Sequence, residues 1–214
     1  MRHLPEAWLR TCRRVRARGD VAQAGAELLG RYAEAHRRYH DLTHLDEVLR
    51  HVDELAHHAT DPDAVRLAAW YHDAVYEPAA TDNEERSAQL ASHALSSLQV
   101  DPTTVREVGR LVRLTATHAP EPGDTNGAVL CDADLAVLAE GPERYDAYVD
   151  AVRAEYGHVN DAAFARGRAE VLRGLLALDP MFHTADARSA WEPAARRNLT
   201  AELGRWETSG PTGR

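Results

Sequence analysis

The chain has 214 residues, and its formal net charge of −9 arises from 34 acidic residues against 25 basic ones. A negative charge of this size argues against a nucleic acid polymer as a partner, because such a polymer needs a basic surface. Hydrophobic residues make up 44% of the chain and charged residues 28%, so the composition is that of one globular domain rather than a disordered chain.

Apolar residues recur at three-to-four spacing along most of the chain, and almost no segment alternates as a β-strand does. A capping box of Thr43 and Asp46 and the pairs Asp61-Pro62 and Asp101-Pro102 mark three helix starts. The predicted helices cover 5–18, 20–36, the stretch from Thr43 to Leu55, the stretch from Asp61 to Asp73, two stretches that begin at Asp82 and Asp101, and then 128–140, 142–157, 160–178 and 186–206. The predicted fold class is therefore all-α, a bundle of about eight to ten helices.

Two boundaries follow from the same patterns. The stretch 119–127 is rich in Pro, Gly, Asp and Asn and is predicted to be a loop that rims the functional site. Residues 207–214 lack helical spacing and are predicted to form a flexible tail. One helical domain over 1–206 is the resulting expectation.

The sequence also bears on compartment and chemistry. No stretch approaches the ~20 apolar residues of a membrane span, and residues 1–6 lack the apolar core of a signal peptide, so we expect a cytoplasmic protein without a membrane partner. Cys12 and Cys131 lie in no Cys-x-x-Cys pair and are expected to be buried thiols. All 25 basic residues are arginine, which excludes lysine-dependent chemistry such as a P-loop.

Two short motifs concentrate the side chains that can bind a metal ion. The motif Tyr-His-Asp-Leu-Thr-His at 39–44 contains His40 and His44, which on a helix share one face with ~5–6 Å between β-carbons. The motif Trp-Tyr-His-Asp at 70–73 places an imidazole beside a carboxylate. Three imidazoles and a carboxylate suit Fe, Mn, Co, Ni or Zn.

The order His44, His72-Asp73 and then an aspartate in Cys-Asp-Ala-Asp-Leu (131–135) resembles the signature of the HD-domain metal-dependent phosphohydrolases. The first motif is also similar to the Tyr-His-Asn-x-x-His motif of cyclic-nucleotide phosphodiesterases, with Asp41 in place of Asn. A closer resemblance is to a bacterial group of predicted HD-superfamily phosphohydrolases. It rests on Tyr-His-x-Leu-x-His, His-Asp-Ala-Val-Tyr and Asp-Asn-Glu-Glu-Arg-Ser and covers about residues 30–200.

This resemblance implies an HD-domain helical bundle and assigns roles to named residues. The implied metal ligands are His44, His72, Asp73 and Asp134, which would bind one or two divalent ions (Mn, Fe, Co, Ni, Zn or Mg). His40 would donate a proton to the leaving group. Residues two apart on a helix point away from each other, so Asp132 and Asp134 cannot both serve, and Asp132 is expected to cap its helix.

Other residues are candidates with a structural alternative beside each role. Glu84 in Asp-Asn-Glu-Glu-Arg-Ser could direct its carboxylate to the metal or its water, or could only satisfy the helix dipole. His118, and less favourably Asp132, could bind a second metal or the phosphate. Arg153 and Arg168 are weak candidates for substrate binding and could instead form ion pairs between helices.

The remaining histidines are expected to have no catalytic role. Arg37 and Arg38 indicate a solvated face around His36, and His51, His57 and His58 lie on a polar helix.

Three functions fit this sequence. The first is a metal-dependent phosphohydrolase in which metal-activated water attacks the phosphate ester of a small molecule or nucleotide. The second is an HD-type di-iron oxygenase, which would need ligands for a second iron. The third is a non-catalytic module that binds a metal or a nucleotide.

Overall fold

The structure, a computed structural model, describes residues 3–208 and contains ten α-helices, two 3₁₀ helices and no strand in that range. The predicted all-α class and number of helices are confirmed. The α-helices are α1 (Leu4–Arg14), α2 (Val21–Tyr32), α3 (Leu42–Leu55), α4 (Pro62–Tyr71), α5 (Asn83–Ser97), α6 (Pro102–Leu114), α7 (Thr125–Leu135), α8 (Pro142–Glu155), α9 (Asp161–Ala177) and α10 (Ala185–Thr208). The 3₁₀ helices η1 (Ala56–His58) and η2 (Ala136–Ala139) follow α3 and α7.

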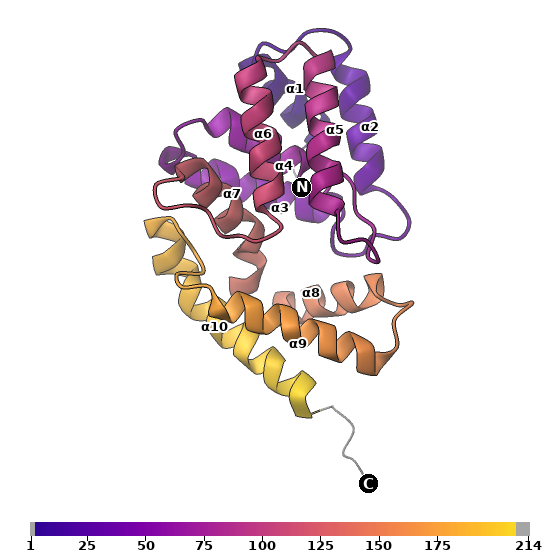
Figure 1. Cartoon of the computed structure of the whole chain (residues 1–214), viewed down its shortest axis with the longest axis vertical. Coiled ribbons are helices and arrows are strands. Elements are labelled where there is room, and N and C mark those ends of the chain that lie inside the picture. Colours follow the sequence, from indigo (N-terminus) through magenta and orange to yellow (C-terminus); the bar gives the residue numbers. More distant parts are fainter. Residues whose placement is uncertain (1–2, 209–214) are drawn as a thin grey trace.

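Figure 1 shows two groups of helices, with α1–α7 in the upper part and α8, α9 and α10 beneath them. α4 is the centre of the upper part, because α1, α3, α5, α6 and α7 all pack against it. Its residues Val65, Leu67 and Trp70 have no exposed surface. Close packing on every side holds a helix rigidly, so the end of α4 at Tyr71 is a fixed point for residues 72–73.

Two of the predicted helix caps are confirmed. The carboxylate of Asp61 accepts a hydrogen bond from the N–H of Ala64 (3.0 Å), and that of Asp101 accepts one from Thr103 (2.8 Å). Asp82 precedes α5 at the N-cap position but makes no capping hydrogen bond.

The predicted start of α3 was wrong in one respect. Asp41, and not a box of Thr43 and Asp46, caps this helix by accepting from the N–H groups of Thr43 (2.7 Å) and His44 (3.2 Å). The helix therefore begins at Leu42, one residue before Thr43, and places His44 firmly in its first turn.

Several boundaries differ from those predicted. α7 begins at Thr125 inside the predicted loop 119–127, because Asp124 caps it by accepting from the N–H of Gly127 (2.9 Å). α2 ends at Tyr32 rather than at residue 36, since the chain beyond it turns toward the candidate site. α10 continues to Thr208, and residues 209–214 of the predicted tail lie outside the described residues.

Cys12 and Cys131 are free and buried, as the sequence predicted. Within residues 3–208, no helix combines the length and the apolar character that crossing a membrane requires.

A buried ion pair joins the lower helices. Arg168 of α9 donates to both carboxylate oxygens of Glu202 in α10 (2.8 and 3.1 Å) and to the hydroxyl of Tyr148 in α8 (3.0 Å). Tyr145 and Trp206 also donate to Glu202, which has no exposed surface. The Glu202 carboxylate thus collects donors from all three lower helices.

We expect Glu202→Ala to lower the free energy of unfolding by about 3–5 kcal/mol, because it leaves the charge of Arg168 buried and unpaired. Glu207→Ala is the matched control: Glu207 also joins α9 to α10 through Arg173 (2.7 Å), but half of its side chain is exposed. That pair should contribute less than about 1 kcal/mol. Urea unfolding measures both values, and equal losses would contradict the prediction.

Candidate metal centre

The four predicted metal ligands come from three separate segments. His44 lies in the first turn of α3, His72 and Asp73 directly follow α4, and Asp134 is the penultimate residue of α7. Because α3 and α7 both pack against α4, the three segments meet at the end of the buried helix. The structure thus brings together all four residues that the sequence motifs singled out.

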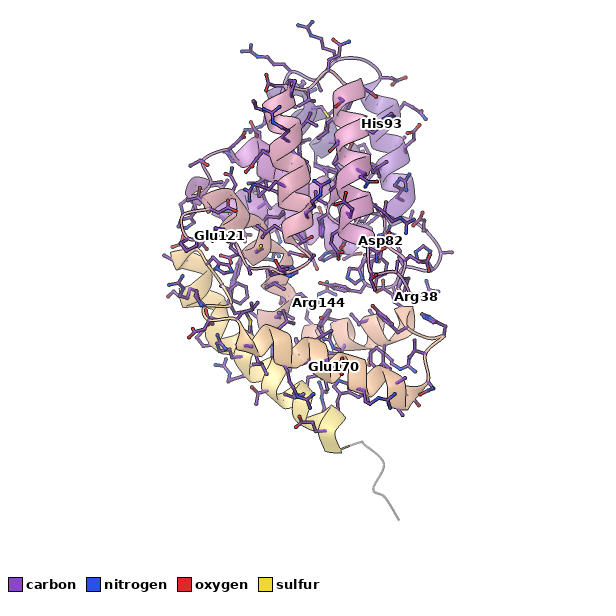
Figure 2. All side chains as sticks on the ribbon, viewed as in Figure 1. Arg38, Asp82, His93, Glu121, Arg144 and Glu170 are labelled. Atoms are coloured by element: carbon purple, nitrogen blue, oxygen red, sulfur yellow. The ribbon has the colours of Figure 1, made fainter. Side chains whose placement is uncertain are left out.

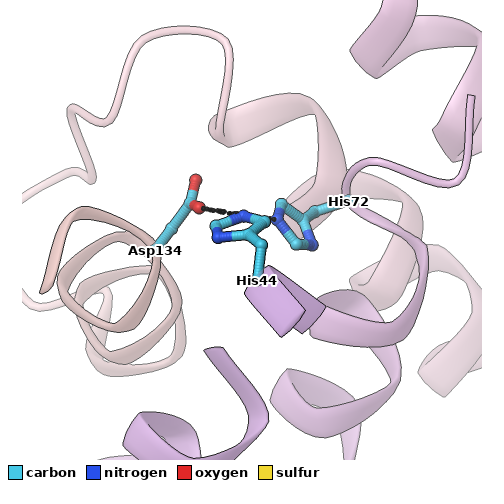
Figure 3. A group of neighbouring side chains, drawn as sticks. All are labelled: His44, His72 and Asp134. Atoms are coloured by element: carbon cyan, nitrogen blue, oxygen red, sulfur yellow. Dashed lines mark hydrogen bonds and ion pairs between the residues drawn. The ribbon is translucent and has the colours of Figure 1, made fainter. Parts of the chain in front are cut away.

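The side chains converge on one point (Figure 3). Nε2 of His44 lies 3.1 Å from Nε2 of His72 and 3.2 Å from Oδ1 of Asp134, and Nε2 of His72 lies 3.4 Å from the same oxygen. Oδ2 of Asp73 lies 3.4 Å from Nε2 of His44 and 3.1 Å from Nε2 of His72. Both imidazoles are buried, and both carboxylates are largely covered.

Hydrogen bonding fixes which nitrogen of His72 faces the cluster. Nδ1 of His72 donates to the carbonyl of Ala69 (2.8 Å), so Nε2 is the nitrogen that can bind a proton or a metal ion. That atom lies 3.1 Å from Nε2 of His44, so either a proton on one of the two nitrogens or a cation between them must separate their lone pairs. The carboxylates of Asp73 and Asp134 beside both imidazoles favour positive charge in the cluster.

The pKa shifts have the same physical origin. Burial would lower the pKa of His44, but hydrogen bonds to Asp134 and Asp73 raise it to about 9. Despite burial, Asp73 raises the pKa of His72 well above its usual value. Burial would raise the pKa of the Asp73 and Asp134 carboxyls, yet His72 lowers both well below their usual range. A divalent ion would take the place of the protons that these groups hold.

The donor set fits such an ion. His44, His72 and Asp134 each offer one ligand atom, and these atoms lie within 4.8 Å of one another. With Asp73, they supply two imidazole nitrogens and two carboxylates, which suits Zn, Mn, Fe, Co or Ni. His40 is not among the residues of this group.

His40 is instead held by a carboxylate that the sequence motifs did not assign. Oε2 of Glu155, at the end of α8, accepts from Nδ1 of His40 (2.7 Å) and from the hydroxyl of Tyr76 (2.9 Å). Oε1 accepts from three consecutive backbone N–H groups, those of residues 38–40 (2.8, 2.9 and 2.9 Å). This leaves Nε2 of His40 for the cavity that the residue lines.

Arg37 ties the first motif to the second. It is buried, which corrects the predicted solvated face at this residue, whereas His36 and Arg38 are exposed as predicted. The side chain of Arg37 has no exposed surface. Nη1 donates to the carbonyls of His40 and Asp73 (both 2.8 Å), and Nη2 donates to that of Ala74 (3.4 Å). A single buried guanidinium therefore holds the segment of the candidate proton donor against the His-Asp doublet.

His118 and Asp132 have different surroundings. Nε2 of His118 contacts Oδ2 of Asp134 (2.9 Å), on the oxygen that does not face His44 and His72. The carboxylate of Asp132 accepts from the N–H groups of His183 and Thr184 (both 2.7 Å), immediately before α10. The expectation that Asp132 caps its own helix was therefore wrong. Its two carboxylate oxygens instead hold the residues that precede α10.

The Asp-Asn-Glu-Glu-Arg-Ser motif is mostly structural. Asn83 bonds the backbone of Glu77 in both directions (3.1 and 3.0 Å), and the hydroxyl of Ser87 accepts from the N–H of Val75 (3.0 Å). These bonds hold the loop that follows His72 and Asp73. Within the motif, the residues that line the cavity are Asn83 and Glu84.

The two arginine candidates serve packing. Arg153 donates to the carbonyls of Tyr156 (2.8 Å) and Val159 (3.1 Å) and lies over the ring of Phe164. Arg168 belongs to the buried pair with Glu202. We therefore carry neither residue further as a phosphate ligand.

The remaining histidines lie away from the cluster. His51 is buried against Trp191, with the ring centres 5.0 Å apart, so it belongs to the packing of α3 and not to a polar face. Nε2 of His57 and Nε2 of His58 each lie 3.1 Å from Oδ2 of Asp186, in a surface group of possible ligand atoms that the sequence did not predict.

A cavity of about 930 Å³ opens beside the metal cluster. Its lining includes His40, Glu84, His118 and Asp134, together with one side of α9. The predicted rim 119–127 contributes no lining residue, because the loop residues that reach the cavity are 116–118. The cavity gives a substrate access to Asp134 and His40 at once.

The chain matches no family model, no curated protein and no solved structure. The candidate site thus rests on the residues and their geometry.

We expect Asp134→Asn to weaken binding of a divalent ion by at least about tenfold, because it removes a charged ligand. Asp132→Asn is the matched control, two residues away and buried, and should keep the ion while it lowers stability. Metal per chain, measured by mass spectrometry after reconstitution, tests both variants. Retention of the ion by Asp134→Asn, or its loss from Asp132→Asn alone, would contradict the assignment.

Glu155 gives a prediction about acid stability. Burial would raise the pKa of its carboxyl, but the bonds from His40 and the backbone N–H groups hold the pKa at about 2, against 4.5 for an ordinary glutamate. This stabilisation, about 3 kcal/mol, is present above pH 4.5 and is lost as the pH falls toward 2.

Glu155→Gln should therefore lower the free energy of unfolding at pH 7, and the gap to the unchanged chain should narrow by about 2 kcal/mol at pH 3. Urea unfolding in the presence of a chelator measures the gap at each pH. A gap that stays constant between pH 7 and pH 3 would refute the role of the charge.

Proposed function

We propose that this chain is a metal-dependent phosphohydrolase of the HD type, which holds a divalent ion among His44, His72, Asp73 and Asp134. The observation that carries the proposal is the convergence of these four groups beside a cavity that Asp134 and His40 both line. The groups that converge are the ones that the HD resemblance implied as ligands. A structural role alone would not require two imidazole nitrogens to face each other in a buried cluster.

A divalent ion at such a site supplies an activated water nucleophile and Lewis acidity toward a phosphoryl oxygen. The residues of the chain supply the rest. His118 orients the Asp134 carboxylate, because its Nε2 lies 2.9 Å from the oxygen that does not face His44 and His72. His40, oriented by Glu155 and stacked on Tyr76 with ring centres 4.1 Å apart, exchanges a proton with the leaving oxygen through Nε2.

The arrangement favours this function over the two alternatives. A di-iron oxygenase needs further ligands beside the first ion, and in residues 3–208 only His118 lies beside Asp134 on the side away from the cluster. A binding module would need no oriented imidazole at the cavity wall, whereas His40 is fixed at Nδ1 and free to act at Nε2.

The proposal predicts that His40→Ala lowers kcat by about 10²–10⁴ while metal content is unchanged, because a proton donor is lost and no ligand is. Hydrolysis of n-butyl phosphate and di-n-butyl phosphate by the metal-loaded protein measures kcat, because the alkoxide that leaves each ester needs a proton. His93→Ala is the control, since His93 is an exposed histidine at the far end of α5 (Figure 2).

Two outcomes would sink the proposal. One is a fully metal-loaded protein that hydrolyses neither ester with Mn, Fe, Co, Ni, Zn or Mg. The other is a His40→Ala variant that is as active as His93→Ala. Loss of metal from His40→Ala would instead make His40 a ligand and remove its proposed role as proton donor.

A further inference from the structure

The cavity extends well beyond the metal cluster, along α9. One face of this helix lines it, with members three or four residues apart: Ala163, Phe164, Gly167, Val171, Gly174 and Leu175. We call this face the α9 groove. From residue 163 to Leu178 the helical rise amounts to ~22 Å, several times the width of a phosphate group. Figure 1 shows α9 running beneath the upper helices along its length.

The α9 groove is apolar. The cavity wall opposite and beside it adds Val152, Tyr156 and Val159, so the surface away from the metal cluster offers mostly hydrocarbon and aromatic rings. Val171 is 53% exposed and is the one large hydrophobic side chain of residues 3–208 with such exposure. An apolar surface that is continuous with a polar centre is typical of a ligand site that binds a molecule with one charged end.

The cavity offers no free positive charge for a second phosphate. Arg168 is the one arginine among its lining residues, and Glu202 neutralises it through two hydrogen bonds. The amide of Asn83, which could read a nucleobase, bonds the backbone of Glu77 instead. A diphosphate, a triphosphate or a nucleotide would therefore leave buried polar groups without partners.

Two glycines widen the groove without any structural need. A Cβ atom added at Gly167 or Gly174 would meet nothing within 4 Å, and the two residues lie two turns apart on the same face. Glycine inside a helix costs about 1 kcal/mol relative to alanine, and close packing does not explain the cost here. The two positions leave open space against the helix backbone, where an apolar ligand can lie.

We propose that the substrate is a phosphate ester with a single phosphoryl group and an extended apolar alcohol, whose chain lies in the α9 groove. This inference rests on the proposed function, since it places the phosphoryl group at the metal cluster. Water adds to phosphorus, the P–O bond to the alcohol breaks, and the alkoxide takes a proton from His40. The attacking water releases one proton to solvent, and His40 takes one proton back from solvent. The products are inorganic phosphate and the free alcohol.

The first test compares n-butyl, n-octyl and n-dodecyl phosphate, each below its micelle concentration, with ADP on the metal-loaded protein. We expect kcat/KM to rise by about tenfold or more from butyl to octyl phosphate, because additional methylenes leave water. ADP should be the poorest substrate. A rate that does not depend on chain length, or a preference for ADP over octyl phosphate, overturns the inference.

The second test uses Gly167→Leu, which fills the groove. The ratio of kcat/KM for octyl over butyl phosphate should fall by about tenfold, whereas Gly30→Leu should leave it unchanged. Gly30 is the matched control, because it is an exposed glycine inside α2 whose added Cβ would also meet nothing within 4 Å. Equal ratios in the two variants would show that the chain does not occupy the groove.

A binding measurement separates this inference from the proposed function. In metal-free protein, 1-octanol should raise the melting temperature of the unchanged chain and of Gly30→Leu but not that of Gly167→Leu. If octanol binds in this pattern and no ester is hydrolysed, apolar binding in the α9 groove is supported and the proposed phosphohydrolase function is contradicted. If the short esters are hydrolysed while octanol stabilises all three proteins equally or not at all, the phosphohydrolase function is supported and apolar binding in the α9 groove is contradicted.

Discussion

The buried carboxylate of Glu155 is the interaction on which the geometry of the site depends. It joins the lower helices to the upper ones, because it ends α8 and receives donors from residues 38–40 and from Tyr76. Five hydrogen bonds on two oxygens offset the cost of burying one charge. Without them, the His40 ring loses the carboxylate that orients it, and α8 loses its hydrogen bonds to the segment before α3.

The sequence was sufficient to predict the helices and to single out the four residues that converge in the candidate metal centre, because periodicity and motif spacing are local signals. It was not sufficient to identify Asp41 as the N-cap of α3. Asp41 and Thr43 can both cap a helix here, and the backbone geometry decides between them. Arg37 pairs with carbonyls from residues far along the chain, which no local pattern reveals. One local feature could have identified Glu155. A negative charge in the last turn of a helix interacts unfavourably with the helix dipole, which indicates that the carboxylate has a stabilising partner elsewhere.

The cavity shows why a site can be predicted better than its specificity. Its polar end consists of residues that motifs identify, whereas its apolar wall consists of small, aliphatic and aromatic residues that form no motif. The composition of the stretch 119–127 predicted a loop at the rim of the site. Residues 125–127 belong to α7, however, and α9 lines the cavity instead. Which face of a helix stays uncovered is decided by packing with distant elements, and α9 turns its other side to α10.

Arg37 has a consequence for the order of assembly. The guanidinium binds the two motifs together through carbonyl oxygens of His40, Asp73 and Ala74, and none of these contacts involves a metal ligand atom. The protein is therefore expected to complete its fold before any ion arrives, unlike small domains whose folding and metal binding are one event. If the proposed site binds an ion, loading is a late step into a prepared site, and supply determines which ion binds as much as the ligands do.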